Sequence, residues 1–132
     1  IQGIEREETY HLVGDVGFNG KNGNDAPKEN CIGSEVKVGI DGEDGANGEK
    51  GDKGGDAFIY TNDLKKLSLL TLIQTGGKGG AGGVGGKGSF GCNGGEQGRT
   101  GSDGKSGDIG EYGNVFILKK DFKIKRQIYQ RF

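Results

Sequence analysis

Glycine recurs at every third residue along nearly half of this chain. It keeps this phase in four runs, which we call the first to fourth glycine runs: 14–23, 39–54, 76–94 and 95–113. A period of three matches the left-handed polyproline II helix, in which every third residue lies on one face. Glycine on that face lets neighbouring backbones approach and exchange the hydrogen bonds that such helices cannot form internally. The phase therefore predicts packed helices of this kind; a flexible glycine-rich linker is the alternative.

The composition excludes several classes of protein. Glycine supplies 31 of 132 residues but proline only one, far below the share found in a collagen triple helix. No apolar stretch approaches the ~20 residues that cross a bilayer. The 18 basic and 19 acidic residues nearly cancel, so neither nucleic acid nor a membrane surface is expected as a partner. The length favours a single domain over residues 1–132.

Two of the glycine runs differ in a way that predicts where each one lies. From 76 to 88 the repeat is Gly-Gly-x, which leaves two bare faces and places this stretch inside the bundle. From 39 to 56 only one face is glycine and the other two carry charge, which favours an edge facing water. The predicted helix-packing glycines are Gly76, Gly79, Gly82, Gly83, Gly85 and Gly86.

Apolar segments of strand length lie between the runs, at 10–13, 57–60, 67–73 and 115–118. Tracing the chain up and down through the runs brings all four segments to one end, in alternating directions. The expected fold is mostly non-regular and β. It is an antiparallel bundle of glycine-rich polyproline II helices that continues from a small antiparallel sheet, together spanning 9–119. Residues 120–132 would form a basic C-terminal strand or tail, and a short helix over 64–72 is an alternative to a strand there.

The same tracing places Cys31 and Cys92 in two loops at the opposite end of the bundle. We therefore predict a disulfide between them, which would close a long loop and stabilise the fold by about 4 kcal/mol in the chain-entropy model. A disulfide implies an oxidising compartment, so we expect an extracellular location or a cell or virion surface. Two unpaired thiols are the alternative.

Motifs associated with catalysis or metal binding carry little weight in this chain. The period itself generates the G-x-G-x-x-G pattern at 86–91, and no strand and helix flank it. His11 is the only histidine, and the acidic residues between 41 and 52 are best read as a solvated face rather than a calcium site. We expect no enzymatic activity, no cofactor and no metal.

Glycine triplets held in phase with so little proline resemble the polyglycine II bundle proteins. These include springtail antifreeze proteins, tip adhesins of some phage tail fibres and the N-terminal domain of Obg GTPases. The stretch GDKGGDAFIYTNDLKKL at 51–67 is similar to the run-to-strand transition of the Obg domain, although no GTPase motif is present. Likeness to the adhesins implies receptor binding by the loops 24–34 and 89–94, with Phe90 and Asn93 as candidates. Likeness to the antifreeze proteins implies a flat array of small residues, which charged residues from Glu43 to Lys53 interrupt.

The two ends of the chain do not follow the glycine period and carry opposite charge. Residues 5–8 hold three acidic residues and one basic, whereas 119–131 hold six basic residues and one acidic. Strand-like segments of opposite charge suit β-augmentation, in which a terminus of one copy pairs with a sheet edge of the next. The predicted assembly residues are Ile4, Glu5, Glu7, Glu8, Phe122, Lys123, Ile124, Lys125, Arg126 and Ile128.

The function expected from these features is an extracellular structural module that assembles with itself, or with other surface proteins, into filaments or a larger surface structure. A receptor-binding adhesin and an antifreeze protein are the alternatives. A further alternative for the ends themselves is that they pair within one subunit and only widen its own sheet.

Overall fold

The computed structural model describes residues 1, 3–118 and 129–131. The chain divides into two compact units, each made of segments distant in sequence. One, here called the strand unit, comprises Ile1–Asp15, Asp52–Gly77 and Ile109–Phe132. The other, the glycine unit, comprises Val16–Gly51 and Lys78–Asp108. Whether the two units form the single domain expected from the chain length stays a prediction.

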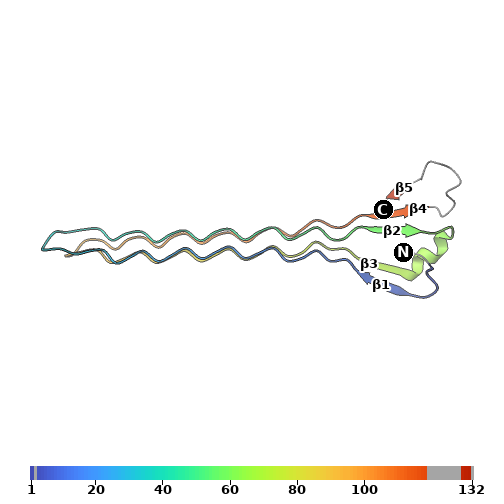
Figure 1. Ribbon diagram of the computed structural model, residues 1–132, viewed down its shortest axis with the longest axis horizontal. Coiled ribbons are helices and arrows are strands. Elements are labelled where there is room, and N and C mark those ends of the chain that lie inside the picture. Colours follow the sequence, from blue (N-terminus) through green and yellow to red (C-terminus); the bar gives the residue numbers. More distant parts are fainter. Residues whose placement is uncertain (2, 119–128, 132) are drawn as a thin grey trace. The chain divides into compact units, whose positions relative to one another are not determined.

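The strand unit holds all of the regular secondary structure that the structure describes. Its elements are β1 (Glu8–His11), β2 (Ala57–Tyr60), η1 (Leu64–Leu69), β3 (Leu70–Ile73), β4 (Val115–Leu118) and β5 (Tyr129–Arg131) (Figure 1). The class is therefore mostly non-regular with short strands, as the sequence predicts. The alternative helix over 64–72 is present in its first part as the 3-10 helix η1, and the remainder belongs to β3, as the predicted strand over 67–73 requires. The Asp63 carboxylate caps η1 by accepting from the Lys65 amide at 3.1 Å.

The strands do not form the single antiparallel sheet expected from the sequence. β1 pairs with β3 in parallel, β2 pairs with β4 in parallel, and these pairs belong to two separate sheets. The physical reason lies in the glycine runs. Each strand pairs with the strand whose adjoining run is already hydrogen-bonded to its own. Gly14 donates to the Thr75 carbonyl at 3.0 Å, in line with the β1–β3 pair, and Gly54 donates to Glu111 at 2.8 Å, in line with β2–β4. Among the strands that the structure describes, only β5, which pairs with β4, adds an antiparallel ladder.

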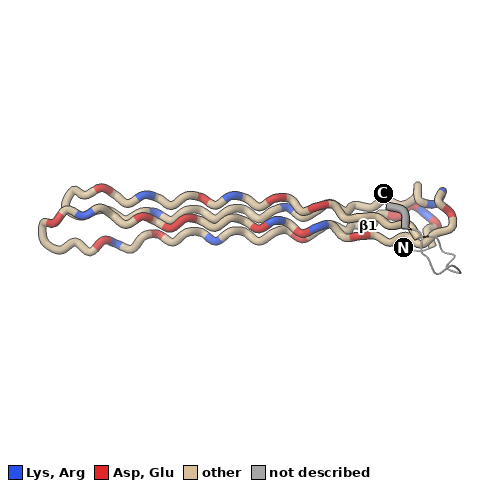
Figure 2. The backbone as a smooth tube through the Cα atoms, turned by 90° about the horizontal axis from the view of Figure 1, so that it is seen from above, with Lys and Arg blue, Asp and Glu red and all other residues tan. Residues whose placement is uncertain are grey.

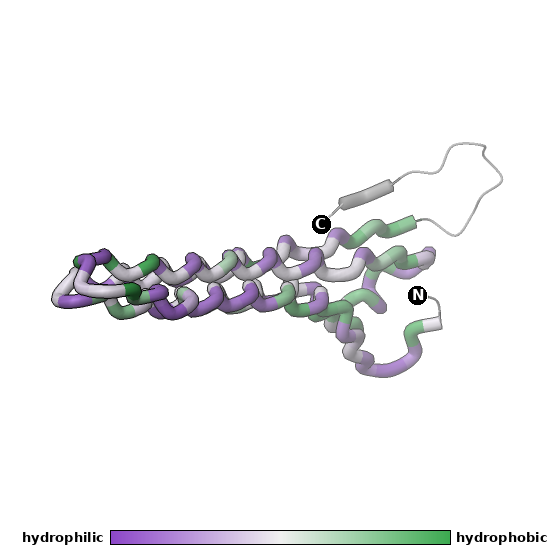
Figure 3. Tube along the Cα trace, turned by 60° about the vertical axis from the view of Figure 1, so that its left-hand side comes forward, coloured by the Kyte–Doolittle hydropathy of each residue, from purple (hydrophilic) through white to green (hydrophobic). Residues whose placement is uncertain are grey.

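The apolar core of the strand unit is small, and β2 and β4 supply most of it. The fully buried residues of these strands are Ala57, Ile59, Ile117 and Leu118. The other face of the pair is more open, and there Phe58 stacks on Phe116 with ring centroids 5.0 Å apart. Figure 3 shows hydrophobic residues concentrated on the strands of this unit. The burial of β2 therefore follows the alternation of strand side chains, whereas β4 buries the consecutive residues Ile117 and Leu118 at its end.

The glycine unit is held together by backbone hydrogen bonds between segments of the four glycine runs. The first run donates to the third at three-residue intervals, and the two run in the same direction. The bonds are Gly17–Lys78, Gly20–Ala81 and Gly23–Val84, each 2.8 Å. The second run donates to the fourth in the same manner, for example from Gly45 to Ser102 at 2.9 Å. Where runs that are consecutive in the sequence are hydrogen-bonded to each other, their chains run in opposite directions.

The third run lies among the other three, as its two bare faces predict. It accepts from the first and fourth runs, and Gly80 and Gly83 donate to Glu49 and Ala46 of the second at 2.8 Å. The second run, however, is not the edge that its charges suggested. It bonds to the first, third and fourth runs, because its backbone N–H groups point inward at successive positions while its charged side chains stay exposed. Figure 2 shows that both signs of charge are interspersed along these runs.

Candidate functional site

Each predicted packing glycine lies directly against another backbone. A methyl group added at Gly82 would overlap the carbonyl oxygen of Gly104, and one added at Gly83 would overlap that of Lys21. The same holds for the other four, whose nearest carbonyls belong to Gly110 (Gly76), Gly107 (Gly79), Gly101 (Gly85) and Asn24 (Gly86). Since a backbone oxygen cannot rotate away as a side chain can, these contacts require glycine.

Asparagine and aspartate side chains form a second set of contacts between the runs, which sequence reasoning missed. In the first and second runs, and at Asp25 just after the first run, the residue two places after a glycine accepts a hydrogen bond from a backbone N–H of the partner run. The acceptors are Asn19, Asn22, Asp25, Asp41, Asp44 and Asn47, at 2.6–2.9 Å from their donors. The sequence does contain a pattern that predicts these contacts, because Asn or Asp recurs two places after glycine, as G-x-[N/D], with the glycine period.

Removing one of these acceptors should weaken the glycine unit measurably. Asp44→Ala deletes the acceptor of the Ser102 N–H, a 2.6 Å bond, and we expect a loss of about 1 kcal/mol in unfolding free energy. Asp44→Asn keeps an acceptor oxygen in place and should stay within about 0.5 kcal/mol of the parent protein. Urea titration followed by circular dichroism measures both. Glu49→Ala is the matched control; equal losses in all three variants would contradict a bonding role for Asp44.

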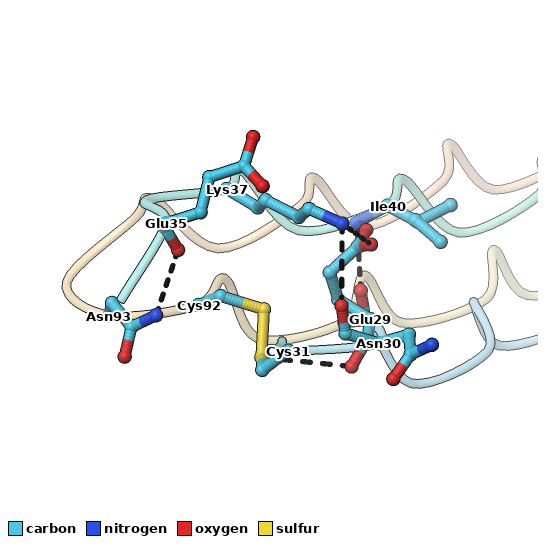
Figure 4. A network of polar contacts seen from close by, with 9 residues as sticks. Glu29, Asn30, Cys31, Glu35, Lys37, Ile40, Cys92 and Asn93 are labelled. Carbon is cyan, nitrogen blue, oxygen red and sulfur yellow. Dashed lines mark hydrogen bonds and ion pairs between the residues drawn. A yellow bond between two sulfur atoms is a disulfide. The ribbon is translucent and has the colours of Figure 1, made fainter. Parts of the chain in front are cut away.

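The disulfide predicted from the sequence is present at the loop end of the glycine unit. Cys31 and Cys92 are bonded, with Cα atoms 5.5 Å apart (Figure 4). Beside it, Cys92 and Lys37 exchange backbone hydrogen bonds of 2.8 and 3.2 Å as an isolated antiparallel bridge. The Lys37 ammonium also lies 3.9 Å from the Glu29 carboxylate. The segments 29–37 and 92–93 are therefore joined by a covalent bond and by backbone hydrogen bonds, while the ion pair lies within the first of them.

The two predicted loop residues turn out to play different roles. The Asn93 side chain donates to the carbonyls of Gly33 at 3.0 Å and Glu35 at 2.8 Å, so it braces one loop against the other (Figure 4). Phe90 instead is 80% exposed. Ile32 and Val36 are also largely exposed in the same segments. A cavity of about 230 Å³ lies beside Phe90, lined also by Ala26, Lys28, Glu29, Cys31, Ser89 and Gly91.

The predicted assembly residues of the N-terminal segment lie in the strand unit, and one of them, Ile4, is not available for contact. Ile4 is 4% exposed and belongs to the apolar core. Glu5 lies 3.4 Å from the Lys66 ammonium, and Glu7 is exposed. Glu8 accepts a 2.8 Å hydrogen bond from the Tyr10 hydroxyl, and this bond raises the pKa of Tyr10 above its ordinary value.

The strand edges of this unit differ in how far they are covered. The outer edge of β4 pairs with β5 of the same chain, so a C-terminal strand widens its own sheet, but its partner is β4 and not the N-terminal segment that the alternative pairing of the two ends involved. At β2, the Ile1 carbonyl accepts from the Tyr60 N–H at 3.1 Å. β1, in contrast, has β3 as its one strand neighbour among the described residues, and its Thr9, Tyr10 and His11 are exposed. The predicted residues Phe122, Lys123, Ile124, Lys125, Arg126 and Ile128 lie outside the described residues.

No protein-family model, curated protein or solved structure matches the chain. Within residues 1, 3–118 and 129–131, no group of three or more His, Cys, Asp or Glu side chains is placed to hold a metal ion. In the same part of the chain, no helix is long and apolar enough to cross a membrane.

Proposed function

We propose that this protein is an extracellular structural module that associates with further copies of itself through its oppositely charged ends. In this proposal the glycine runs are polyproline II helices, packed into an antiparallel bundle that gives the module its rigidity. Two observations support the helix type: the backbone donors recur every third residue, and each bond reaches another run rather than the same one. The disulfide suits an oxidising location outside the cell or on a surface.

The observation that carries the assembly proposal is the open edge of β1. A strand with an exposed, unpaired edge offers backbone donors and acceptors to another chain. Among the described residues, the edges of β2 and β4 already have contacts within the subunit, whereas β1 and β3 have only each other as strand partners, and of these two β1 follows the acidic segment. β1 is therefore the acceptor strand in our proposal, and the acidic segment 5–8 adjoins it.

The donor in this proposal is the basic segment 119–128 of a second copy, whose role rests on its sequence. It alternates apolar and basic residues around Phe122 and Ile124, as a strand with one polar face does. Its positive charge complements the acidic residues before β1 and would favour this pairing over like-charged alternatives. Because the contact joins two different surfaces, it is head-to-tail and produces filaments unless its rotation closes a ring.

A charge exchange tests this contact. Glu7→Lys should weaken self-association by placing like charges at the contact, and Lys123→Glu with Lys125→Glu should do the same. Combining the three substitutions should restore association, since the charges are again complementary. Light scattering at several concentrations and low salt measures each variant, with Glu96→Lys in the glycine unit as the matched control. Association that is unaffected by any of these changes would contradict the proposed contact.

The exposed apolar residues at the loop end favour a second candidate, an adhesin. Phe90 lines the cavity and is 80% exposed, Ile32 in the other loop is 70% exposed, and exposed apolar side chains of this kind suit contact with another protein. In this alternative the disulfide and the Asn93 brace hold the loops in a fixed shape for a receptor. An antifreeze surface is less favoured, because charged residues such as Glu49 and Lys50 are exposed along the runs.

A further inference from the structure

The dipeptide Asn-Gly occurs four times in the chain, beginning at Asn19, Asn22, Asn47 and Asn93. In this dipeptide the glycine nitrogen can attack the Cγ atom of the asparagine side chain. A bond forms between nitrogen and Cγ, the Cγ–Nδ2 bond breaks, and ammonia leaves with the proton of the glycine N–H. Water then opens the resulting five-membered imide to aspartate or isoaspartate. The reaction needs a glycine N–H that is free and an asparagine side chain that can turn toward it.

Three of the four sites are locked by the contacts between the glycine runs. The Gly20 N–H donates to the Ala81 carbonyl at 2.8 Å, and the Asn19 side-chain oxygen accepts from the Ala81 N–H at 2.8 Å. Both reacting groups are thus engaged by one residue of the neighbouring run. The same double contact joins Asn22–Gly23 to Val84 and Asn47–Gly48 to Lys105. At these sites, attack requires the runs to separate.

The fourth site lies in a tight turn at the loop end. The Gly95 N–H donates to the Cys92 carbonyl at 2.9 Å, and the two residues between them have positive φ, 48° at Asn93 and 84° at Gly94. Asn-Gly is a typical sequence for such a turn. Both residues are exposed, and the Gly94 N–H donates to no group within the described ranges. The attacking nitrogen is therefore not engaged at this site, whereas both reacting groups are engaged at the other three. The Asn93 side chain has to release only its own bonds to Gly33 and Glu35 before the attack.

We infer that Asn93 is a site of spontaneous modification, at which the folded protein converts asparagine to aspartate and isoaspartate while the other three sites are protected. The conversion has a structural consequence. The Nδ2 group that donates to Gly33 and Glu35 is lost, and a carboxylate takes its place opposite two carbonyl oxygens. The product therefore removes the brace between the loops beside the Cys31–Cys92 disulfide. Ageing of the protein would in this way loosen its loop end.

Incubation of the folded, oxidised protein at neutral pH, followed by proteolysis and mass spectrometry, tests the inference. We expect Asn93 to convert about tenfold faster than each of the other three, which corresponds to an extra barrier of about 1.4 kcal/mol at the locked sites. The matched control is the same protein reduced and held in urea, where all four sites should convert at similar rates. Conversion of Asn19, Asn22 or Asn47 before Asn93, or equal rates in the folded protein, would overturn the inference.

The structural consequence has its own measurement. Asn93→Asp reproduces one product, and we expect its disulfide to be reduced by dithiothreitol faster than that of the parent protein. Aged protein should show the same increase in proportion to its converted fraction. Unchanged reduction rates in both samples would overturn the proposed loosening of the loop end.

Discussion

Valine in place of Gly82 or Gly83 will abolish cooperative unfolding, because the folded glycine unit has no room for a side chain at either position. The new Cβ atom would overlap the Gly104 or the Lys21 carbonyl oxygen, and relief requires two runs to move apart. Each run is held by a series of such contacts, so the cost should exceed about 5 kcal/mol, comparable to the whole stability of a typical domain. Thermal scans by circular dichroism would show no transition.

The matched control for this experiment is Ala81→Val, one residue away in the same run. Ala81 is exposed and already carries a Cβ atom, so we expect a change within about 0.5 kcal/mol. If the glycine variants melt like the parent protein, the claim that the runs approach each other too closely for a side chain is wrong. If Ala81→Val also unfolds the protein, the run is sensitive to valine itself rather than to loss of glycine.

Loss of the disulfide is the change with the second largest expected effect. Cys31 and Cys92 are separated by 61 residues, and opening a loop of this length should cost about 4 kcal/mol in the chain-entropy model. For a chain of this size that loss lowers the melting temperature by about 10–15 °C. Cys31→Ser is the better variant, because Cys31 is exposed whereas Cys92 is 1% exposed and its replacement would also disturb packing.

A reductant provides the control for the disulfide variant. Dithiothreitol should lower the melting temperature of the parent protein to that of Cys31→Ser, and it should leave the variant unchanged. A variant that melts with the oxidised parent protein would show that the disulfide adds no stability to the glycine unit.

Features that repeat were predictable from the sequence. The glycine phase predicted which residues lie against another backbone, since only glycine tolerates that distance, and the Gly-Gly-x stretch correctly predicted a run in contact with all the others. The disulfide also followed, because tracing the runs brings Cys31 and Cys92 to the same end. The bounds of β2 and β4 agree with the predicted apolar segments.

Features that depend on which segments pack against each other in the fold were not predictable from the sequence pattern. The sequence predicted one antiparallel sheet, but β1 pairs with β3 in parallel because their adjoining residues are already bonded in parallel. The inner position of the second run was missed because its charges were taken as a sign of an edge. Asp41 and Asp44 in fact accept backbone hydrogen bonds of the fourth run. Ile4 was predicted to take part in assembly, but it is buried, and the sequence alone does not show which apolar residue of the N-terminal segment is buried.

The central claim is that this module assembles with copies of itself, and sedimentation velocity of the full chain tests it most directly. Measured over a wide range of protein concentration at low salt, the sedimentation coefficient should rise continuously as head-to-tail oligomers grow. It should return toward the monomer value in high salt, because the contact depends on opposite charges. A single species at the monomer mass at every concentration and salt level would contradict the claim.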